Sequence, residues 1–379
     1  MSGRSVLGPA SLREAGALSF LVAALGVSGC DNPTPSEPAS TPVAVAAATQ
    51  AADKATVKVF ATGLKSPRGF VFGGRDIYVA EAGSGGDRST KGECAQVGSP
   101  PGPYTNGPTA RISRIGPHGN RSTFASGFPS AMSADGDLDG VADVAFVGSD
   151  LYALVSGGGC SHGSRSVPAS IVKVSSSGQW SVVADLSAYL KAHPVAHPPG
   201  DFEPDGTWFS MRPIRGILFA VEPNHGEVVR IDPSTGQVRR IVDLSAKLGH
   251  IVPTALAERF GNLFFGNLGI FPVTPGDQKV WSLARNGDVA VAKGGFTTVL
   301  GLDFDSRGRM YVLETSHAPG FPTPNTGRVV RINSDGSRTV IVDGLFFPTA
   351  MRFGPDGKLY VSNKGFGPEP GELLQVDVP

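Results

Sequence analysis

The stretch Gly301-Leu302-Asp303-Phe304-Asp305-Ser306-Arg307-Gly308-Arg309-Met310-Tyr311 contains the pattern that decides the fold. It predicts a strand of alternating apolar residues, a tight turn at Arg307-Gly308 and a second strand centred on Tyr311. Further copies of the pattern occur at Arg68–Phe72 to Tyr78, Asp143–Phe146 to Tyr152, Gly206–Phe209 to Phe219, Ala255–Leu256 to Phe264 and Ala350–Phe353 to Tyr360. Third strands are expected at Arg111–Ile115, Ile171–Val174, Val228–Ile231, Val280–Leu283, Val329–Ile332 and Leu373–Val376. Repeats of about 45 to 50 residues with four short strands are typical of propeller blades, so the sequence predicts an all-β, six-bladed β-propeller.

The first predicted strand, Val57–Phe60, has no repeat of its own to join. It is followed by a Gly-Leu pair, as is the predicted fourth strand Val340–Val342, and the sixth repeat stops after its third strand. We therefore expect Val57–Phe60 to complete the sixth blade and to close the ring, which leaves no open sheet edge. A seven-bladed fold stays open as an alternative if the long stretches 83–108 or 186–204 contain strands.

The composition supports a single turn-rich domain. The chain has 379 residues, with 51 Gly, 31 Pro and 17% charged residues, a balance that suits many tight turns and few helices. Lys and Arg together number 33, as do Asp and Glu, so there is no basic excess to bind a nucleic-acid backbone. We expect a monomer with no nucleic-acid partner.

The first thirty residues resemble an export signal. Arg4 and Arg13 are followed by the apolar stretch Ala15–Val27, which is too short to span a bilayer core of ~30 Å but suits a signal peptide. Val27-Ser28-Gly29-Cys30 resembles the bacterial lipobox, which implies cleavage before Cys30 and lipidation of its thiol. An ordinary secretory signal is the alternative.

The export signal and the lipobox-like sequence predict three segments of the chain and a cellular location. Residues 1–29 would be the signal peptide, 30–54 the lipidated cysteine and a flexible linker rich in Pro, Ser, Thr and Ala, and 55–379 the propeller. The protein would be exported and anchored in a membrane of the bacterial cell envelope, on the periplasmic or outer side.

The long connections are expected on one face of the propeller. Loops between second and third strands share a face with the links between blades, and the longest are 83–108, 156–169, 267–278 and 315–326, together with the links 128–141 and 186–204. Cys94 and Cys160 fall in two of these loops, on neighbouring blades. In an oxidising compartment they are candidates for a disulfide, although two free thiols remain possible from the sequence alone.

A recurring polar position three residues after the second-strand aromatic suggests a ring of ligands on that face. The candidate pocket residues there are Glu81, Glu222, Asn267, Glu314 and Asn363, joined by Arg68 and Asp205 at the starts of first strands. Oxygen atoms converging on a depression could hold a divalent cation. The alternative is that these side chains satisfy backbone groups at the blade ends.

A second candidate site is the acidic loop Asp135-Gly136-Asp137-Leu138-Asp139-Gly140-Val141-Ala142-Asp143. Its carboxylates stand at loop positions 1, 3, 5 and 9, with Gly at position 6 and the Val141 carbonyl at position 7, a spacing that suits calcium. The predicted Ca²⁺ ligands are therefore Asp135, Asp137, Asp139, Val141 and Asp143, with a solvated acidic turn as the alternative. The pattern resembles the calcium loops of FG-GAP and integrin-type propellers.

Several phrases carry a family resemblance. Ser66-Pro67-Arg68-Gly69, Tyr78–Gly83, Val183-Ala184-Asp185-Leu186 and Tyr360–Asn363 resemble the ScyD/ScyE family, which is similar to NHL and gluconolactonase-like propellers. The resemblance covers roughly residues 55 to 379 and implies the propeller fold. It supplies no catalytic residues. Gluconolactonase-like enzymes hold a metal with a Glu/Asn/Asp set, but their motifs cannot be matched residue by residue here.

Two functions follow from these features. The first is a tethered module that binds a small molecule or a protein on its loop face and carries a structural Ca²⁺. The second is a metal-dependent lactonase or hydrolase that uses a second divalent ion in the ring of glutamates. The Ser161-His162-Gly163 stretch lacks the strand-turn-helix setting of a hydrolase nucleophile, so no catalytic residue is predicted.

Overall fold

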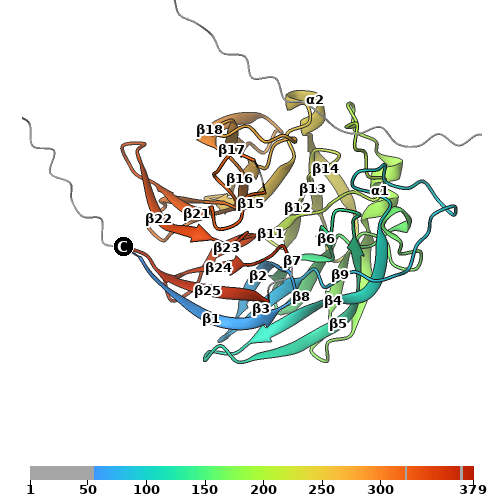
Figure 1. The fold of residues 1–379 in the computed structure, drawn as a ribbon, viewed down its shortest axis with the longest axis horizontal. Helices are drawn as coiled ribbons and strands as arrows, with labels where there is room; N and C mark the ends of the chain where they lie inside the picture. The colour runs from blue at the N-terminus through green and yellow to red at the C-terminus, as the bar shows by residue number, and fades with distance from the viewer. Residues whose placement is uncertain (1–54, 321, 368–369) are drawn as a thin grey trace, which may run out of the picture. The chain divides into compact units, whose positions relative to one another are not determined.

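Six antiparallel sheets surround a central axis in the computed structural model, which describes residues 55–320, 322–367 and 370–379 (Figure 1). The all-β, six-bladed β-propeller expected from the repeats is confirmed. The predicted signal peptide, Cys30 and the linker lie outside the described residues.

Each blade is a meander of strands that pair with their neighbours in sequence. Blade 1 contains β2 (Pro67–Gly73), β3 (Asp76–Glu81), β4 (Thr105–Ile115), β5 (Arg121–Met132) and β6 (Leu138–Asp139). Blade 2 contains β7 (Val141–Val147), β8 (Asp150–Val155), β9 (Ser170–Val174) and β10 (Trp180–Asp185). Blade 3 contains β11 (Ser210–Ile214), β12 (Ile217–Glu222), β13 (Glu227–Ile231) and β14 (Val238–Asp243). Blade 4 contains β15 (Pro253–Arg259), β16 (Asn262–Asn267), β17 (Gln278–Leu283) and β18 (Val289–Phe296). Blade 5 contains β19 (Val299–Phe304), β20 (Met310–Glu314), β21 (Gly327–Ile332) and β22 (Arg338–Leu345).

Blade 6 is completed by the N-terminal strand. It contains β23 (Ala350–Phe353), β24 (Leu359–Asn363), β25 (Gly371–Asp377) and β1 (Thr56–Leu64), in the order β1-β25-β24-β23. The β1 strand pairs antiparallel with β25 from Thr56, opposite Asp377, to Leu64, opposite Gly371. Figure 1 shows the blue β1 beside the red β25. The predicted closure of the ring is therefore confirmed.

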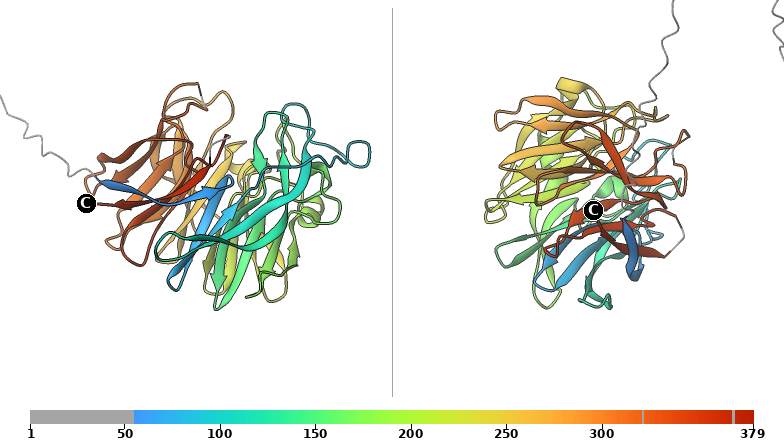
Figure 2. Two further views of the ribbon diagram at one scale, coloured as in Figure 1. Left: turned by 60° about the horizontal axis from the view of Figure 1, so that its bottom comes forward. Right: turned by 90° about the vertical axis from the view of Figure 1, so that its left-hand side faces the viewer.

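The long stretches named in the seven-blade alternative contain no additional blade in the described part of the chain. One short strand was not predicted: β6 lies in the link 128–141 and pairs with the end of β5, where Ala131 faces Asp139 and Met132 faces Leu138. This fifth strand brings Asp139 to the loop face of blade 1. Figure 2 (left) shows the loop between β3 and β4 reaching out from that side.

The apolar core is divided among the blade interfaces. In the described residues, each pair of neighbouring blades encloses its own buried cluster, with Leu154 and Met211 between blades 2 and 3 and Val221 and Phe265 between blades 3 and 4. Both faces of each sheet are thus apolar, because each blade is covered by a neighbour on either side.

The first strands of the six blades line the axis. The central cavity between them has room for about 20 Å³ of water, and its lining includes Asp143, Arg212 and Arg352. That volume corresponds to about one water molecule. The axis is therefore a packed, charged core and not an open channel for a substrate.

In the part of the chain that the structure describes, three short helices lie in the links and loops of the loop face. They are η1 (Cys160–His162), α1 (Leu186–Ala192) and α2 (Leu244–Leu248). The two α-helices follow the fourth strands of blades 2 and 3 and begin at equivalent aspartates, Asp185 and Asp243. Each aspartate accepts a hydrogen bond from the backbone N–H three residues on, at 2.8 Å and 3.0 Å, which is the usual N-cap arrangement.

Candidate metal centre

The three glutamates of the predicted ligand ring are bound within their own blades. Each is fully buried and accepts a hydrogen bond from the link that leads into the first strand of its blade. These bonds join Lys65 N to Glu81 at 2.5 Å, Thr207 N to Glu222 at 2.6 Å and Thr297 N to Glu314 at 2.7 Å. Third-strand arginines add ion pairs, from Arg111 to Glu81 at 2.8 Å and from Arg328 to Glu314 at 2.6 Å. Because a buried carboxylate needs such partners, these side chains stabilise the blade ends and do not form the predicted open ring.

The remaining members of the predicted pocket are also engaged locally. Asn267 accepts hydrogen bonds from Lys279 N at 2.9 Å and from Trp281 Nε1 at 3.2 Å, within blade 4. Asn363 donates to Glu372 at 3.2 Å, within blade 6. The structure thus supports the alternative interpretation, in which these amides satisfy groups at the blade ends.

Arg68 and Asp205 take part in contacts between blades. Arg68 donates to Leu138 O at 2.7 Å and to Gly365 O at 2.5 Å, and so joins blade 6 to the β6 strand of blade 1. Asp205 accepts two hydrogen bonds from Ser161, at 2.8 Å from its N–H and 2.5 Å from its hydroxyl. Both residues lie beside the centre described below.

The five predicted calcium ligands are not brought together. Asp143 points to the axis, where its carboxylate binds Arg352 Nη2 at 2.8 Å and Met211 N at 2.8 Å. Val141 is a buried residue of β7, whereas Asp135 and Asp137 are exposed, and Asp137 caps Leu138 N at 2.8 Å. The local spacing of the loop suits calcium, but β7 begins within the loop and carries Asp143 away from the other carboxylates. The structure thus separates Asp143 from the other predicted ligands, and Ca²⁺ binding by this loop stays a prediction from the sequence.

One member of that loop, Asp139, belongs to a different cluster. Asp139 of β6, His162 of η1 and Glu203 of the link before β11 place one ligand atom each within 4.8 Å of one another. Among the described residues, these three side chains form the one group of His, Cys, Asp or Glu whose geometry could hold a metal ion. It unites blades 1, 2 and 3 on the loop face.

Hydrogen bonds at Nδ1 fix the orientation of the His162 ring. Its Nδ1 lies 3.1 Å from Gly158 O and 3.3 Å from Ser156 O, and since both partners are acceptors, Nδ1 carries a proton and donates. Nε2 therefore faces the carboxylates, 3.0 Å from Glu203 Oε2. Histidines that bind metals usually donate their other ring N–H to a carbonyl or carboxylate in this way.

Burial makes the electrostatics of the cluster unusual. Burial raises the pKa of Asp139 to about 7, although the nearby His162 opposes this shift. Burial alone would lower the pKa of His162, but the hydrogen bond and charge of Glu203 outweigh it and raise that pKa to about 9. Burial also raises the pKa of Tyr104, whose ring packs 4.8 Å from the His162 ring. The carboxyl groups of Asp139 and Glu203 thus concentrate negative charge beside His162 Nε2, and this charge needs a proton or a bound cation to balance it.

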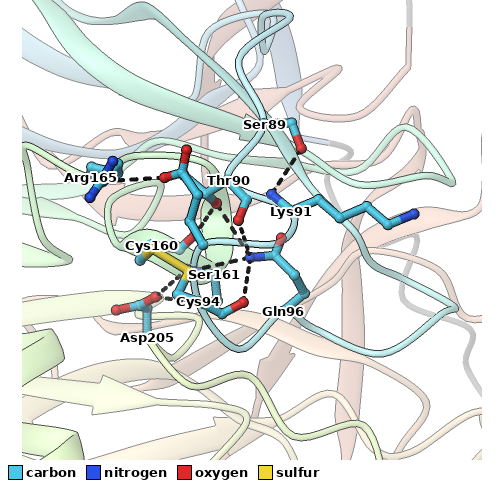
Figure 3. Close-up of a disulfide and its surroundings, with 10 residues drawn as sticks. Ser89, Thr90, Lys91, Cys94, Gln96, Cys160, Ser161, Arg165 and Asp205 are labelled. Carbon is cyan, nitrogen blue, oxygen red and sulfur yellow. Dashed lines mark hydrogen bonds and ion pairs between the residues drawn. A yellow bond between two sulfur atoms is a disulfide. The ribbon is translucent and has the colours of Figure 1, made fainter.

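A disulfide holds the short helix that carries His162 (Figure 3). Cys94 and Cys160 are bonded, with Cα atoms 6.3 Å apart, and join the long loop of blade 1 to η1 of blade 2. Beside the disulfide, Asp205 accepts the two hydrogen bonds of Ser161. His162 follows Cys160 and Ser161 directly, so the disulfide and Asp205 both constrain its position.

Sequence reasoning missed two of the three residues. His162 lies in a stretch that lacks the setting of a hydrolase nucleophile, and Glu203 lies in the long link 186–204, so neither residue carries a local metal-binding signal. A usable signal was present: a His and two carboxylates all lie in long connections expected on the same face. Their convergence, however, depends on how three separate loops fold over one another.

Comparisons with known proteins give the fold class. No protein-family model and no curated protein matches the sequence. The structure is similar to that of a glucose dehydrogenase-type oxidoreductase from Thermus thermophilus, with a TM-score of 0.53, 17% identity, and coverage of 85% of this chain and 100% of that chain. It is also similar to a gluconolactonase from Xanthomonas campestris, with a TM-score of 0.50, 12% identity, and coverage of 86% of this chain and 90% of that chain.

A third similar structure is a luciferin-regenerating enzyme, with a TM-score of 0.50, 10% identity, and coverage of 85% of this chain and 95% of that chain. At these identities the three neighbours define the fold alone, a β-propeller. Membership of the ScyD/ScyE family stays a prediction from the sequence phrases. Among the described residues, none of the helices has the length and apolar character to span a membrane.

Proposed function

We propose that the protein is a lipid-anchored, extracytoplasmic propeller that binds its ligand on the loop face through a divalent metal ion held by Asp139, His162 and Glu203. The observation that carries the proposal is the convergence of these three side chains from three blades, with His162 held so that Nε2 faces the two carboxylates. His162 and Glu203 are buried and Asp139 is half-buried, and a group of this kind has few explanations other than a structural ion pair or a ligand site.

The donor set indicates the class of metal. Ca²⁺ prefers six to eight oxygen ligands, whereas an imidazole nitrogen with two carboxylates suits a transition ion such as Zn²⁺ or Mn²⁺. We therefore propose Zn²⁺ or Mn²⁺ at this centre in place of the Ca²⁺ expected from the acidic loop. Three protein ligands leave coordination positions that a bound ligand or water can fill.

Isothermal titration of the purified, metal-free protein with Zn²⁺ and Mn²⁺ tests the proposal. We expect one site per chain, and we expect His162→Ala, Glu203→Gln and Asp139→Asn each to weaken it at least about 100-fold. The loss of a direct ligand should cost at least as much as the 10- to 100-fold loss typical of its supporting partners. Plasma mass spectrometry of the protein as purified would identify the resident metal.

Asp137→Asn and Glu222→Gln are the matched controls. Asp137 is an exposed carboxylate two residues from Asp139, and Glu222 is a buried carboxylate of the predicted ligand ring. Both variants should keep metal affinity within about threefold, since neither residue supplies a ligand atom to the cluster. Two results would contradict the proposed metal site: wild-type protein that binds neither ion, or Glu203→Gln protein that binds as tightly as wild type.

A metal-dependent hydrolase is the second candidate, because a three-ligand centre has free positions at which a metal can polarise a carbonyl. The gluconolactonase among the structural neighbours shares the fold and motivates the choice of lactones. The titrated variants can be assayed on a panel of lactones and esters in the same experiment. Hydrolysis that disappears in His162→Ala and persists in Asp137→Asn would assign catalysis to the centre, and metal binding without turnover would leave a binding module.

The anchor rests on Cys30, which lies outside the described residues. We expect wild-type protein to partition into the membrane fraction and to incorporate labelled palmitate, and we expect Cys30→Ala to do neither, because one lipidated cysteine is the attachment point. Fractionation of cells that produce each form measures this. Membrane association that is equal in both forms would contradict the lipid anchor.

A further inference from the structure

Aromatic pairs connect neighbouring blades near the short hairpin turns, on the face opposite the long loops. In each pair, the second-strand aromatic of one blade packs edge-on against a first-strand phenylalanine of the next. The ring centroids are 5.5 Å apart for Tyr78 and Phe146, 5.2 Å for Phe264 and Phe304, 4.9 Å for Tyr311 and Phe353, and 5.2 Å for Tyr360 and Phe72. Such pairs fill the wedge between two sheets that diverge from the axis.

Blade 4 lacks this phenylalanine. In blade 5 the position is Phe304, which lies opposite Met310, the residue before the aromatic Tyr311. In blade 4 the equivalent residue lies opposite Leu263, before the aromatic Phe264, and it is Glu258. Glu258 is exposed, and its carboxylate accepts a hydrogen bond from the Gly261 N–H in its own turn. The wedge beside Phe219 of blade 3 is consequently left without its aromatic partner.

A hollow of about 300 Å³ occupies this place between blades 3 and 4. Its walls are mainly apolar: Ile214, Ile217, Phe219, Ile241, Leu263 and Leu283. The volume is at the lower end of the range typical of small-molecule pockets. The metal centre, in contrast, lies on the loop face between blades 1, 2 and 3, so the two sites are independent.

Three arginines stand around the hollow. Arg215 belongs to the β11–β12 turn, Arg230 to β13 and Arg285 to the β17–β18 turn. In the described part of the chain, none of the three forms an ion pair within 4.0 Å. The pKa of the Asp232 carboxyl is lowered mainly by hydrogen bonds from Ser234 and to a lesser extent by the charge of the nearby Arg230. An apolar hollow surrounded by cations that lack close acidic partners complements a molecule with an anionic head and an apolar tail.

We infer that this hollow binds a small anionic amphiphile, a single-chain carboxylate of medium length taken up from solution. The tail lies against Phe219 and the leucine and isoleucine side chains, and the carboxylate head meets the guanidinium groups. A tail of about ten carbons suits the volume of the hollow. No covalent step is involved.

Decanoate is the probe, and titration calorimetry of the full chain is the measurement. We expect one site for decanoate and at least about tenfold weaker binding of decyltrimethylammonium, which has the same tail and the opposite charge. The double variant Arg230→Gln, Arg285→Gln should weaken decanoate at least about tenfold. Both arginines are exposed, so this variant should keep the fold.

Glu258→Phe is the matched filling variant, because it restores the residue that four other blades carry. We expect it to abolish decanoate binding while keeping or raising the melting temperature. His162→Ala should bind decanoate as wild type does, so that failure of the metal proposal and failure of this one are distinguishable. Equal affinity for both amphiphiles, decanoate binding that survives in Glu258→Phe, or binding to anionic vesicles that decanoate does not displace would each overturn the inference.

Discussion

Replacing Asp143 by alanine is expected to lower the free energy of unfolding by about 3 to 5 kcal/mol. Asp143 lies on the axis with its side chain 3% exposed, and it forms an ion pair with Arg352, whose side chain is 11% exposed. It also accepts a hydrogen bond from Met211 N at 2.8 Å. The substitution would leave Arg352 buried beside the axis without its carboxylate, and the cost of an unpaired buried charge exceeds the value of the pair itself.

The neighbouring Gly69 shows how tightly this site is packed. A Cβ atom at Gly69 would lie 2.0 Å from Asp143 Oδ1, so only glycine leaves room for the carboxylate. The ion pair connects blades 2 and 6 across the axis. Its loss should therefore affect the whole ring and not one blade.

Chemical denaturation of the wild type and variants measures this effect. Asp150→Ala is the surface control, since the Lys173–Asp150 pair is 44% and 46% exposed and should contribute less than about 1 kcal/mol. The double variant Asp143→Asn, Arg352→Met should lose less stability than Asp143→Ala, because no buried charge is left unpaired. A change in unfolding free energy below about 1 kcal/mol for Asp143→Ala would contradict the role assigned to the pair.

Deleting residues 1–64 is expected to abolish cooperative folding or to leave a protein that aggregates. The deletion removes β1, which closes blade 6, and exposes the hydrogen-bonding edge of β25. It also removes Ala61, Leu64 and the Phe60 ring that packs 5.6 Å from Tyr360. Burial of two large apolar side chains contributes roughly 3 to 6 kcal/mol, which is comparable with the entire stability of many domains.

Thermal unfolding followed by circular dichroism, together with gel filtration, checks this result. The matched control lacks residues 1–53 and retains β1, so it separates the effect of the strand from that of the preceding segment. Adding a peptide of residues 55–65 to the shorter protein should restore part of the lost stability by re-forming the β1–β25 pairing. Equal melting temperatures for the two deletions would show that the ring does not depend on β1.

The sequence predicted the fold well because each strand carries its own signal. The repeated aromatic positions, such as Tyr311, and turns such as Arg307-Gly308 are local features, and the six-fold repetition makes the pattern legible. It placed the first strand of blade 3 at Gly206–Phe209, whereas β11 spans Ser210–Ile214, and it missed β6, which is only two residues long, and the helices α1 and α2. Both helices begin with the sequence Asp-Leu-Ser-Ala, at Asp185 and Asp243, so the sequence contains an N-cap signal for each of them.

By itself the sequence determined the blade number, the closing strand and the face that carries the long loops, since these follow from periodicity, turn residues and segment length. Only the tertiary structure decided which carboxylates are placed to hold a metal ion. Glu81, Glu222 and Asp143 bind backbone groups or arginines that come close only after neighbouring strands and blades have packed. Asp139, His162 and Glu203 meet because three loops fold over one face, and contacts between residues so distant along the chain leave no periodic trace in the sequence.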